Sequence, residues 1–256
     1  MNNGKKERAL STRKMAIIGV LGGISMLLGL TPLGFIPVGP TNATIMHIPV
    51  IIGAIIEGPI VGAMVGLIFG IFSLIRAFTA PTVISPVFYN PLVSILPRVL
   101  IGISAFYSYA LFKRLGRKTS KVTLVLIWGG TLYFLTRTLM SQINKYTQGD
   151  LGIWSLFLTL GLIILAILIG ILSYKKLKNQ ALEVVISAAL GTLTNTVGVL
   201  GMVYILYGRW FVEKIGGDIT KVGKAIIGVG IANGIPETIV AMLIVTSVVM
   251  AIKKKV

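Results

Sequence analysis

The sequence contains no cysteine, and it holds one histidine and seven acidic residues among its 256 positions. The absence of cysteine excludes disulfides, thiolate metal ligands and cysteine nucleophiles. The single histidine, His47, argues against zinc and di-iron sites, which need several imidazole or carboxylate ligands. Charged residues make up 12% of the chain, whereas a soluble domain carries roughly 25%. The chain therefore has too little charged surface to face water on all sides.

Catalytic motifs are missing as well. The stretch closest to a phosphate-binding loop runs from Gly217 to Lys224, but its glycine spacing is one residue too long and Ala225 follows the lysine. No Gly-x-Ser-x-Gly elbow or Ser–His–Asp set is present. These absences argue against an enzyme, and we expect no catalytic residue, metal or cofactor in this chain.

Apolar residues dominate what is present. They make up 55% of the chain, and the mean hydropathy is +0.93. A chain of this kind is solvated by lipid, so we predict an all-α polytopic transmembrane bundle that forms a single membrane domain over 1–256. The expected spans are 15–31, 44–57, 60–78, 91–112, 122–140, 152–174, 182–207 and 225–252. The second is short and contains Pro49, and we interpret it as broken, tilted or re-entrant.

The charge distribution predicts the orientation. Most of the 24 basic residues fall on one side of the membrane when the spans alternate, which the positive-inside rule assigns to the cytoplasm. Both termini are then cytoplasmic. This also explains the net charge of +17 without nucleic acid. The clusters are Lys5, Lys6, Arg8, Arg13 and Lys14; Lys113, Arg114, Arg117, Lys118 and Lys121; Lys175, Lys176 and Lys178; and Lys253, Lys254 and Lys255.

Polar side chains inside spans are costly and are candidate functional residues by default. Asn90, Ser94 and Arg98 are four residues apart and therefore share one helical stripe. Arg98 would lie roughly 12 Å along the helix from Asn90. One interpretation is that Arg98 lines a ligand cavity. The alternative is that it reaches lipid headgroups or pairs structurally with Glu237.

Two further spans carry polar stripes at similar depth. Thr192 and Asn195 share a face of one span, where they either pack helices closely or contact a ligand. Asn233 and Glu237 share a face of the last span, next to Pro236, which removes a backbone donor and should kink the helix. The alternative there is a structural hydrogen-bond cluster. The stripes predict one cavity near the external side.

Three more polar residues lie toward that side. A turn at Asn42, the residue His47 and the span-end Arg76 complete the set, although a histidine such as His47 is more often just a helix-end polar residue. The candidate ligand-binding residues are Asn42, His47, Arg76, Asn90, Ser94, Arg98, Thr192, Asn195, Asn233 and Glu237.

Several of these segments resemble the substrate-binding (S) subunits of energy-coupling factor (ECF) vitamin transporters, closest to the pantothenate-type group. The segments are His47–Ala54 with Gly58–Gly62, Asn90–Arg98, Gly191–Thr196 and the last span around Asn233.

The resemblance implies a six-helix bundle in a bacterial cell membrane that binds a vitamin from outside. It also implies a membrane scaffold (T) subunit and two cytoplasmic ATPases as partners, which would use the ATP. Residues 15–118 and 181–256 correspond to the core, and 119–180 would be an inserted hairpin.

The family's first helix carries an Ala-x-x-x-Ala contact for the scaffold. Here Ala16 is followed by Val20, and Gly19 and Gly23 provide a pair of small residues with the same spacing. We assign Ala16, Gly19 and Gly23 to partner binding.

The alternative function is a self-sufficient secondary transporter driven by protons or sodium, with Glu237 as proton carrier. A membrane-embedded enzyme is a third interpretation.

Overall fold

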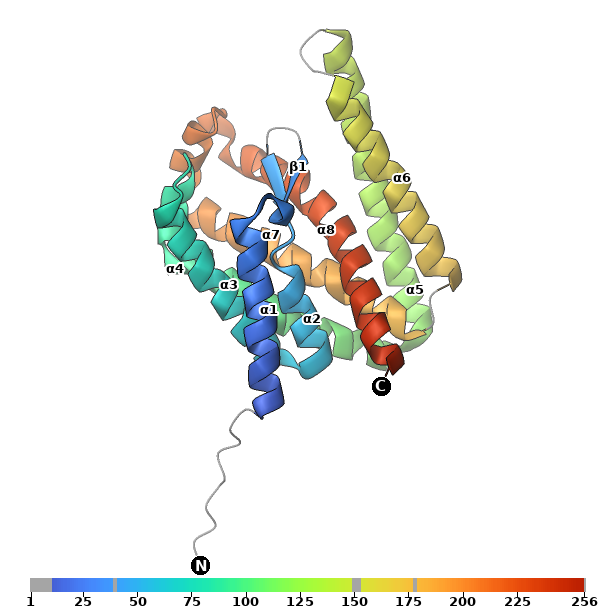
Figure 1. Ribbon diagram of the computed structural model, residues 1–256. Helices are drawn as coiled ribbons and strands as arrows, with labels where there is room; N and C mark the ends of the chain where they lie inside the picture. The colour runs from blue at the N-terminus through green and yellow to red at the C-terminus, as the bar shows by residue number, and fades with distance from the viewer. Residues whose placement is uncertain (1–10, 39–40, 149–152, 177–178, 256) are drawn as a thin grey trace, which may run out of the picture.

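A computed structural model describes residues 11–38, 41–148, 153–176 and 179–255, and it confirms the all-α bundle (Figure 1). Five helical stretches in these ranges are long and apolar enough to cross a membrane: Thr12–Leu30, Pro59–Thr79, Pro91–Asn144, Ala181–Lys214 and Ile219–Lys254. The helices are α1 (Thr12–Leu30), α2 (Ile48–Glu57), α3 (Pro59–Thr79), α4 (Pro91–Ser94), α5 (Leu96–Thr147), α6 (Ile153–Lys176), α7 (Asn179–Lys214) and α8 (Val222–Lys255).

A small antiparallel hairpin adds β structure that the sequence analysis did not predict. Strands β1 (Phe35–Val38) and β2 (Thr41–Thr44) pair with Phe35 opposite Thr44. The hairpin lies between α1 and α2 at the end of the bundle away from the C-terminus (Figure 1). The short 3₁₀ turns are η1 (Pro32–Gly34), η2 (Ser85–Tyr89) and η3 (Ile219–Lys221).

Proline and glycine positions explain where several helices begin. Pro49, Pro59 and Pro91 lie in the first turns of α2, α3 and α4, where a missing backbone donor costs nothing. The prediction that Pro49 breaks a span is therefore wrong: α2 begins beside it and runs regularly for 10 residues. Gly58, with φ of 102°, separates α2 from α3 in a conformation that favours glycine.

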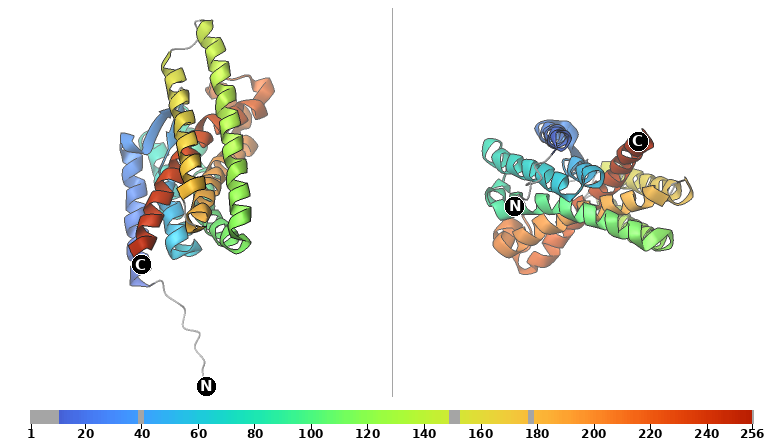
Figure 2. Two further views of the ribbon diagram at one scale, coloured as in Figure 1. Left: turned by 90° about the vertical axis from the view of Figure 1, so that its right-hand side faces the viewer. Right: turned by 90° about the horizontal axis from the view of Figure 1, so that it is seen from below.

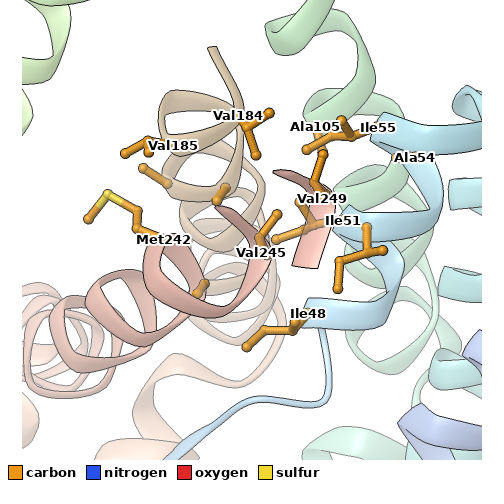
Figure 3. Close-up of a cluster of buried hydrophobic side chains, with 14 of the residues drawn as sticks. Ile48, Ile51, Ala54, Ile55, Ala105, Val184, Val185, Met242, Val245 and Val249 are labelled. Carbon is orange, nitrogen blue, oxygen red and sulfur yellow. The ribbon is translucent and has the colours of Figure 1, made fainter. Parts of the chain in front are cut away.

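Helix α2 is buried, which explains how a helix too short to cross a bilayer is accommodated. Every residue from Ile48 to Ile55 is buried. Figure 3 shows the apolar side chains of α2 facing α5, α7 and α8, with Ile51, Ala105 and Val245 among the contacting residues. The core of the bundle is thus built around α2.

A glycine stripe brings α3 and α5 into backbone contact. Gly62, Gly66 and Gly70 are spaced four apart; a Cβ added at Gly62 or Gly66 would lie within 3.0 Å of the α5 backbone, and one at Gly70 would lie 2.7 Å from the Cα of Ile95, the N-cap of α5. At Gly66 that Cβ would be 2.2 Å from the carbonyl oxygen of Arg98, and at Gly62 it would be 3.0 Å from the Cα of Gly102. Small residues permit such close approach in membranes, so this stripe fixes the position of α5.

The expected spans 91–112 and 122–140 form one element, α5, interrupted at Gly116, which has φ of 81° and ψ of 178°. The part of α5 after Gly116 pairs with α6 to form a helical hairpin, with Gly170 packed on the ring of Trp128. This α5–α6 hairpin rises beside the bundle and extends past the end at which β1 and β2 lie (Figures 1 and 2).

The glycine stripe leads to a first prediction. Gly66→Ala should lower the free energy of unfolding by about 1–3 kcal/mol, because the new Cβ forces α3 and α5 apart. Thermal unfolding of the purified protein in detergent measures this as a lower Tm. Gly23→Ala is the matched control, since nothing lies within 4 Å of its added Cβ. Equal Tm values for the two variants would contradict the argument.

Candidate ligand site

Arg98 lies at the centre of the polar interior. Its side chain is 7% exposed, and its Nη1 donates to the carbonyl oxygen of Val93 at 2.6 Å. The guanidinium carbon lies 5.4 Å from the ring centroid of Phe69 and 5.7 Å from that of Phe88. Two aromatic faces and one carbonyl thus hold the cation in place. Its Nε is buried and has no hydrogen-bond partner among the described residues.

His47 and Thr192 connect α2 to α7. The Nε2 of His47 lies 3.0 Å from the hydroxyl oxygen of Thr192, and that hydroxyl donates to the carbonyl oxygen of Ala188 at 2.9 Å. Because the hydroxyl has a single proton, His47 must donate through Nε2. Its Nδ1 is then a bare acceptor, and it is buried without a partner in the described part of the chain.

Asn195 provides a second bare acceptor one turn along α7 from Thr192. The residue is 7% exposed, and its Oδ1 has no hydrogen-bond partner within the described ranges. A buried acceptor without a donor costs about 1–3 kcal/mol. Such groups are rare in native proteins and call for an explanation, and a bound ligand that supplies the donor is one.

Glu237 holds the β1–β2 hairpin against α8. Its Oε1 accepts from the backbone N–H of Thr44 at 2.7 Å and from the Thr44 hydroxyl at 3.1 Å. Arg98 lies within electrostatic reach of both Glu237 and His47. One residue of each of α5 and α8, Arg98 and Glu237, therefore lies close to the His47–Thr192 pair and the hairpin.

Other candidate residues lie at different places in the fold. The Asn90 side chain accepts from the N–H of Leu92 and donates to the Tyr207 hydroxyl, and Ser94 donates to the carbonyl of Asn90. Arg76 donates to the carbonyl of Gly29 and lies over the ring of Phe35. Asn90 and Ser94 thus stabilise the start of α4, and Arg76 connects α3 to α1.

The structure gives less detail about the last two candidates, Asn42 and Asn233. Asn42 belongs to β2, and its side chain lies outside the part of the chain that the structure describes. Asn233 is half-buried on α8, one turn before Glu237. Pro236 lies within the continuous helix α8. Because it cannot donate, it frees the carbonyl of Ala232.

Sequence reasoning missed three residues of this site. Thr44 and Phe88 belong to connecting segments, and Phe69 looked like an ordinary span residue. Aromatic residues near Arg98 in the sequence were a usable signal for Phe88, because cations pair with aromatic rings. Phe69 gave no comparable signal, because its contact depends on how α3 packs against α5.

The proposed partner-binding residues lie on the outer face of α1, which forms the rim of the bundle seen from below (Figure 2). Ala16 and Gly19 are exposed and Gly23 is half-buried. A Cβ added at Gly19 or Gly23 would meet nothing within 4 Å. By contrast, Gly22 and Gly29 pack against Ile68 and Phe72 inside the bundle. Gly19 and Gly23 are therefore not needed for packing within the bundle.

The site contains cationic, aromatic and amide groups but no cluster of metal ligands: no three His, Cys, Asp or Glu side chains gather among the residues that were placed. A polytopic bundle that encloses polar atoms without partners among the described residues, with a hairpin beside them, has the architecture expected of a membrane protein that binds a small polar solute. The family model for the substrate-specific component of ECF transporters matches residues 13–147 and 126–249. The chain belongs to this family, and it is a transport subunit rather than an enzyme.

Two similar proteins come from lactic acid bacteria. The chain is 36% identical over 122 residues to a pantothenate transporter PanT of Leuconostoc mesenteroides subsp. mesenteroides, an alignment that covers 46% of this chain and 59% of the relative. It is 25% identical over 220 residues to a pantothenic acid transporter PanT of Lactococcus lactis subsp. cremoris, which covers 84% of this chain and 80% of the relative.

The Glu237–Thr44 contact leads to a second prediction. Glu237→Ala should speed amide hydrogen exchange in residues 41–47 by about 10- to 150-fold, because a hydrogen bond to a charged group contributes about 1.5–3 kcal/mol. Glu237→Gln retains an acceptor and should show a smaller change. Hydrogen–deuterium exchange with mass spectrometry measures both. Glu213→Ala, at an exposed residue of α7, controls for loss of charge. Unchanged exchange in Glu237→Ala would show that Glu237 does not hold the hairpin.

Proposed function

We propose that this chain captures pantothenate from the external side of the membrane and passes it to partner subunits of an ECF transporter. Three buried atoms without partners in the described structure support this proposal most strongly: the donor Arg98 Nε and the acceptors His47 Nδ1 and Asn195 Oδ1. A ligand that completes this set needs one acceptor group and two donor groups.

Pantothenate has this pattern of groups. Its carboxylate would accept from Arg98, because guanidinium and carboxylate form strong charge-assisted hydrogen bonds. Its hydroxyl and amide protons would satisfy His47 and Asn195. The name shared by both similar proteins favours the same vitamin. Of the other candidates, Thr192 orients His47, and Asn42, Asn233 and Glu237 lie on the two elements that close the site. Arg76, Asn90 and Ser94 support it from α3 and α4.

The orientation follows from the charges. Arg13 and Lys14 at the start of α1, the basic residues around Gly116 and Lys253–Lys255 in α8 lie at the end of the bundle opposite the hairpin β1–β2 (Figure 1). The positive-inside rule assigns that end to the cytoplasm. Both termini are then cytoplasmic and the ligand site opens outward.

The partners follow from family membership. A T scaffold in the membrane and two cytoplasmic ATPases would supply the energy for release, because no phosphate-binding loop is present in this sequence. The open face of Ala16, Gly19 and Gly23 would contact the scaffold. Residues 15–118 and 181–256 would form the core, and 119–180 an additional membrane hairpin.

A third prediction tests the ligand. Pantothenate should raise the Tm of the purified chain, whereas panthenol, in which an alcohol replaces the carboxylate, should bind about 10- to 150-fold more weakly. Arg98→Gln should reduce pantothenate affinity by a similar factor and leave panthenol affinity nearly unchanged. Titration calorimetry measures the four dissociation constants. Equal losses for both ligands in the variant would contradict an Arg98–carboxylate contact.

A fourth prediction tests the scaffold face. Gly19→Leu and Gly23→Leu should reduce pantothenate uptake by cells while pantothenate binding to the purified chain stays within about twofold of the original. Bulky side chains at these positions point into open space, so they block close approach by another helix without disturbing the bundle. Val20→Leu, on the same helix, is the control. Loss of binding in proportion to uptake would place this face in the ligand site or the core.

A further inference from the structure

The break in α5 gathers basic side chains that the ligand site does not use. Lys113 and Arg114 precede Gly116, and Arg117 and Lys118 follow it; all four are exposed. We call residues 111–122 the elbow. Its chain reversal depends on Gly116, whose φ of 81° few other residues adopt. Four cationic groups from two helix ends therefore project from one short segment.

The elbow is an ordered structure. The hydroxyl of Ser120, which is fully buried, shares its one proton between two acceptors, the carbonyl oxygen of Gly116 at 3.0 Å and, more weakly, that of Phe112 at 3.4 Å. These bonds connect the first turn after the break to the last turn before it. The relative positions of the basic side chains are thus set by the fold, which distinguishes the elbow from a solvated charge run.

Acidic side chains do not neutralise the elbow. Among the described residues, Glu183 is the acidic group in electrostatic reach of Lys113, and it also faces Lys253. Arg114, Arg117 and Lys118 take part in none of the ion pairs found across the described ranges. Three exposed cations at this surface are therefore available to an external anion.

Apolar side chains surround these cations. Leu111, Leu115 and Val122 are about half exposed, at 51%, 49% and 55%, and both flanking helices are apolar. A soluble anion would leave these groups in water. An amphiphile would cover them with hydrocarbon and place its phosphate against the arginines, which bind phosphate oxygens in pairs.

We propose that the elbow is a binding site for the headgroup of an anionic phospholipid in the cytoplasmic leaflet. The phosphate would contact Arg114, Arg117 and Lys118, and the acyl chains would lie along Leu111, Leu115 and Val122. Such a lipid would anchor the base of the α5–α6 hairpin at the membrane surface. The proposal rests on the proposed orientation of the chain, with this end of the bundle at the cytoplasm, and is independent of which vitamin the chain binds.

Lipid titration of the purified chain tests the proposal. Phosphatidylglycerol added to detergent micelles should raise the Tm in a saturable way, because a ligand of the folded state stabilises it. In the triple variant Arg114→Gln, Arg117→Gln, Lys118→Gln the lipid concentration for half-maximal stabilisation should rise on the order of 100-fold. The control Arg209→Gln, Lys214→Gln, Lys224→Gln removes the same charge at the opposite end of the bundle and should behave like the original protein.

Two further experiments distinguish a lipid site of defined geometry from a general attraction between basic side chains and anionic lipid. Ser120→Ala retains every charge but loses the bonds that order the elbow, so it should weaken the phosphatidylglycerol effect by several-fold. Phosphatidylcholine with the same acyl chains, and inorganic phosphate at matched ionic strength, should give no saturable rise. Equal responses of the two triple variants, or an equal response to phosphatidylcholine or inorganic phosphate, would overturn the proposal.

Discussion

The close approach of α3 and α5 is the constraint on which the ligand site depends. Gly66 allows the backbone of α3 to touch the carbonyl of Arg98, and Gly62 and Gly70 extend this contact in both directions. Phe69 also belongs to α3. The close approach of α3 and α5 therefore brings its aromatic ring to the Arg98 guanidinium. Because Gly66 has no side chain, the backbones of α3 and α5 can touch. This contact sets the position of the Arg98 guanidinium and places the Phe69 ring against it.

The polar interior is costly in its unliganded form, and the proposed function gives this cost a role. A buried cation, an imidazole and an amide each leave one hydrogen-bonding atom unpaired among the described residues. The bundle holds these atoms on three elements: His47 at the start of α2, and Arg98 and Asn195 on α5 and α7, whose apolar faces pack around α2. A ligand that pairs all three recovers the lost hydrogen bonds at once, and a ligand that pairs only some of them does not. Selectivity for a vitamin can arise in this way from a small number of contacts.

The sequence predicted the helices well because apolar runs of span length have few other structures available in lipid. It also predicted that Arg98, Asn195 and Glu237 lie at similar depth. It did not separate them from Arg76, because depth along a helix does not determine the direction in which a side chain points. Strands β1 and β2 were missed because their eight residues, which include Pro37, carry no strong strand pattern. Pro49 was misinterpreted because the start of a helix and a break within one both place proline beside apolar residues.

The hydrogen bond between Thr44 and Glu237 uses a main-chain donor. Every amino acid except proline supplies that donor, so the outer hairpin can change almost all of its side chains during evolution and keep its attachment to α8. Substitutions in β1 and β2 would then alter the surface that the proposed site presents to its ligand, while the attachment to α8 persists. The hairpin can thus vary in side-chain chemistry without loss of the main-chain contact that holds it in place.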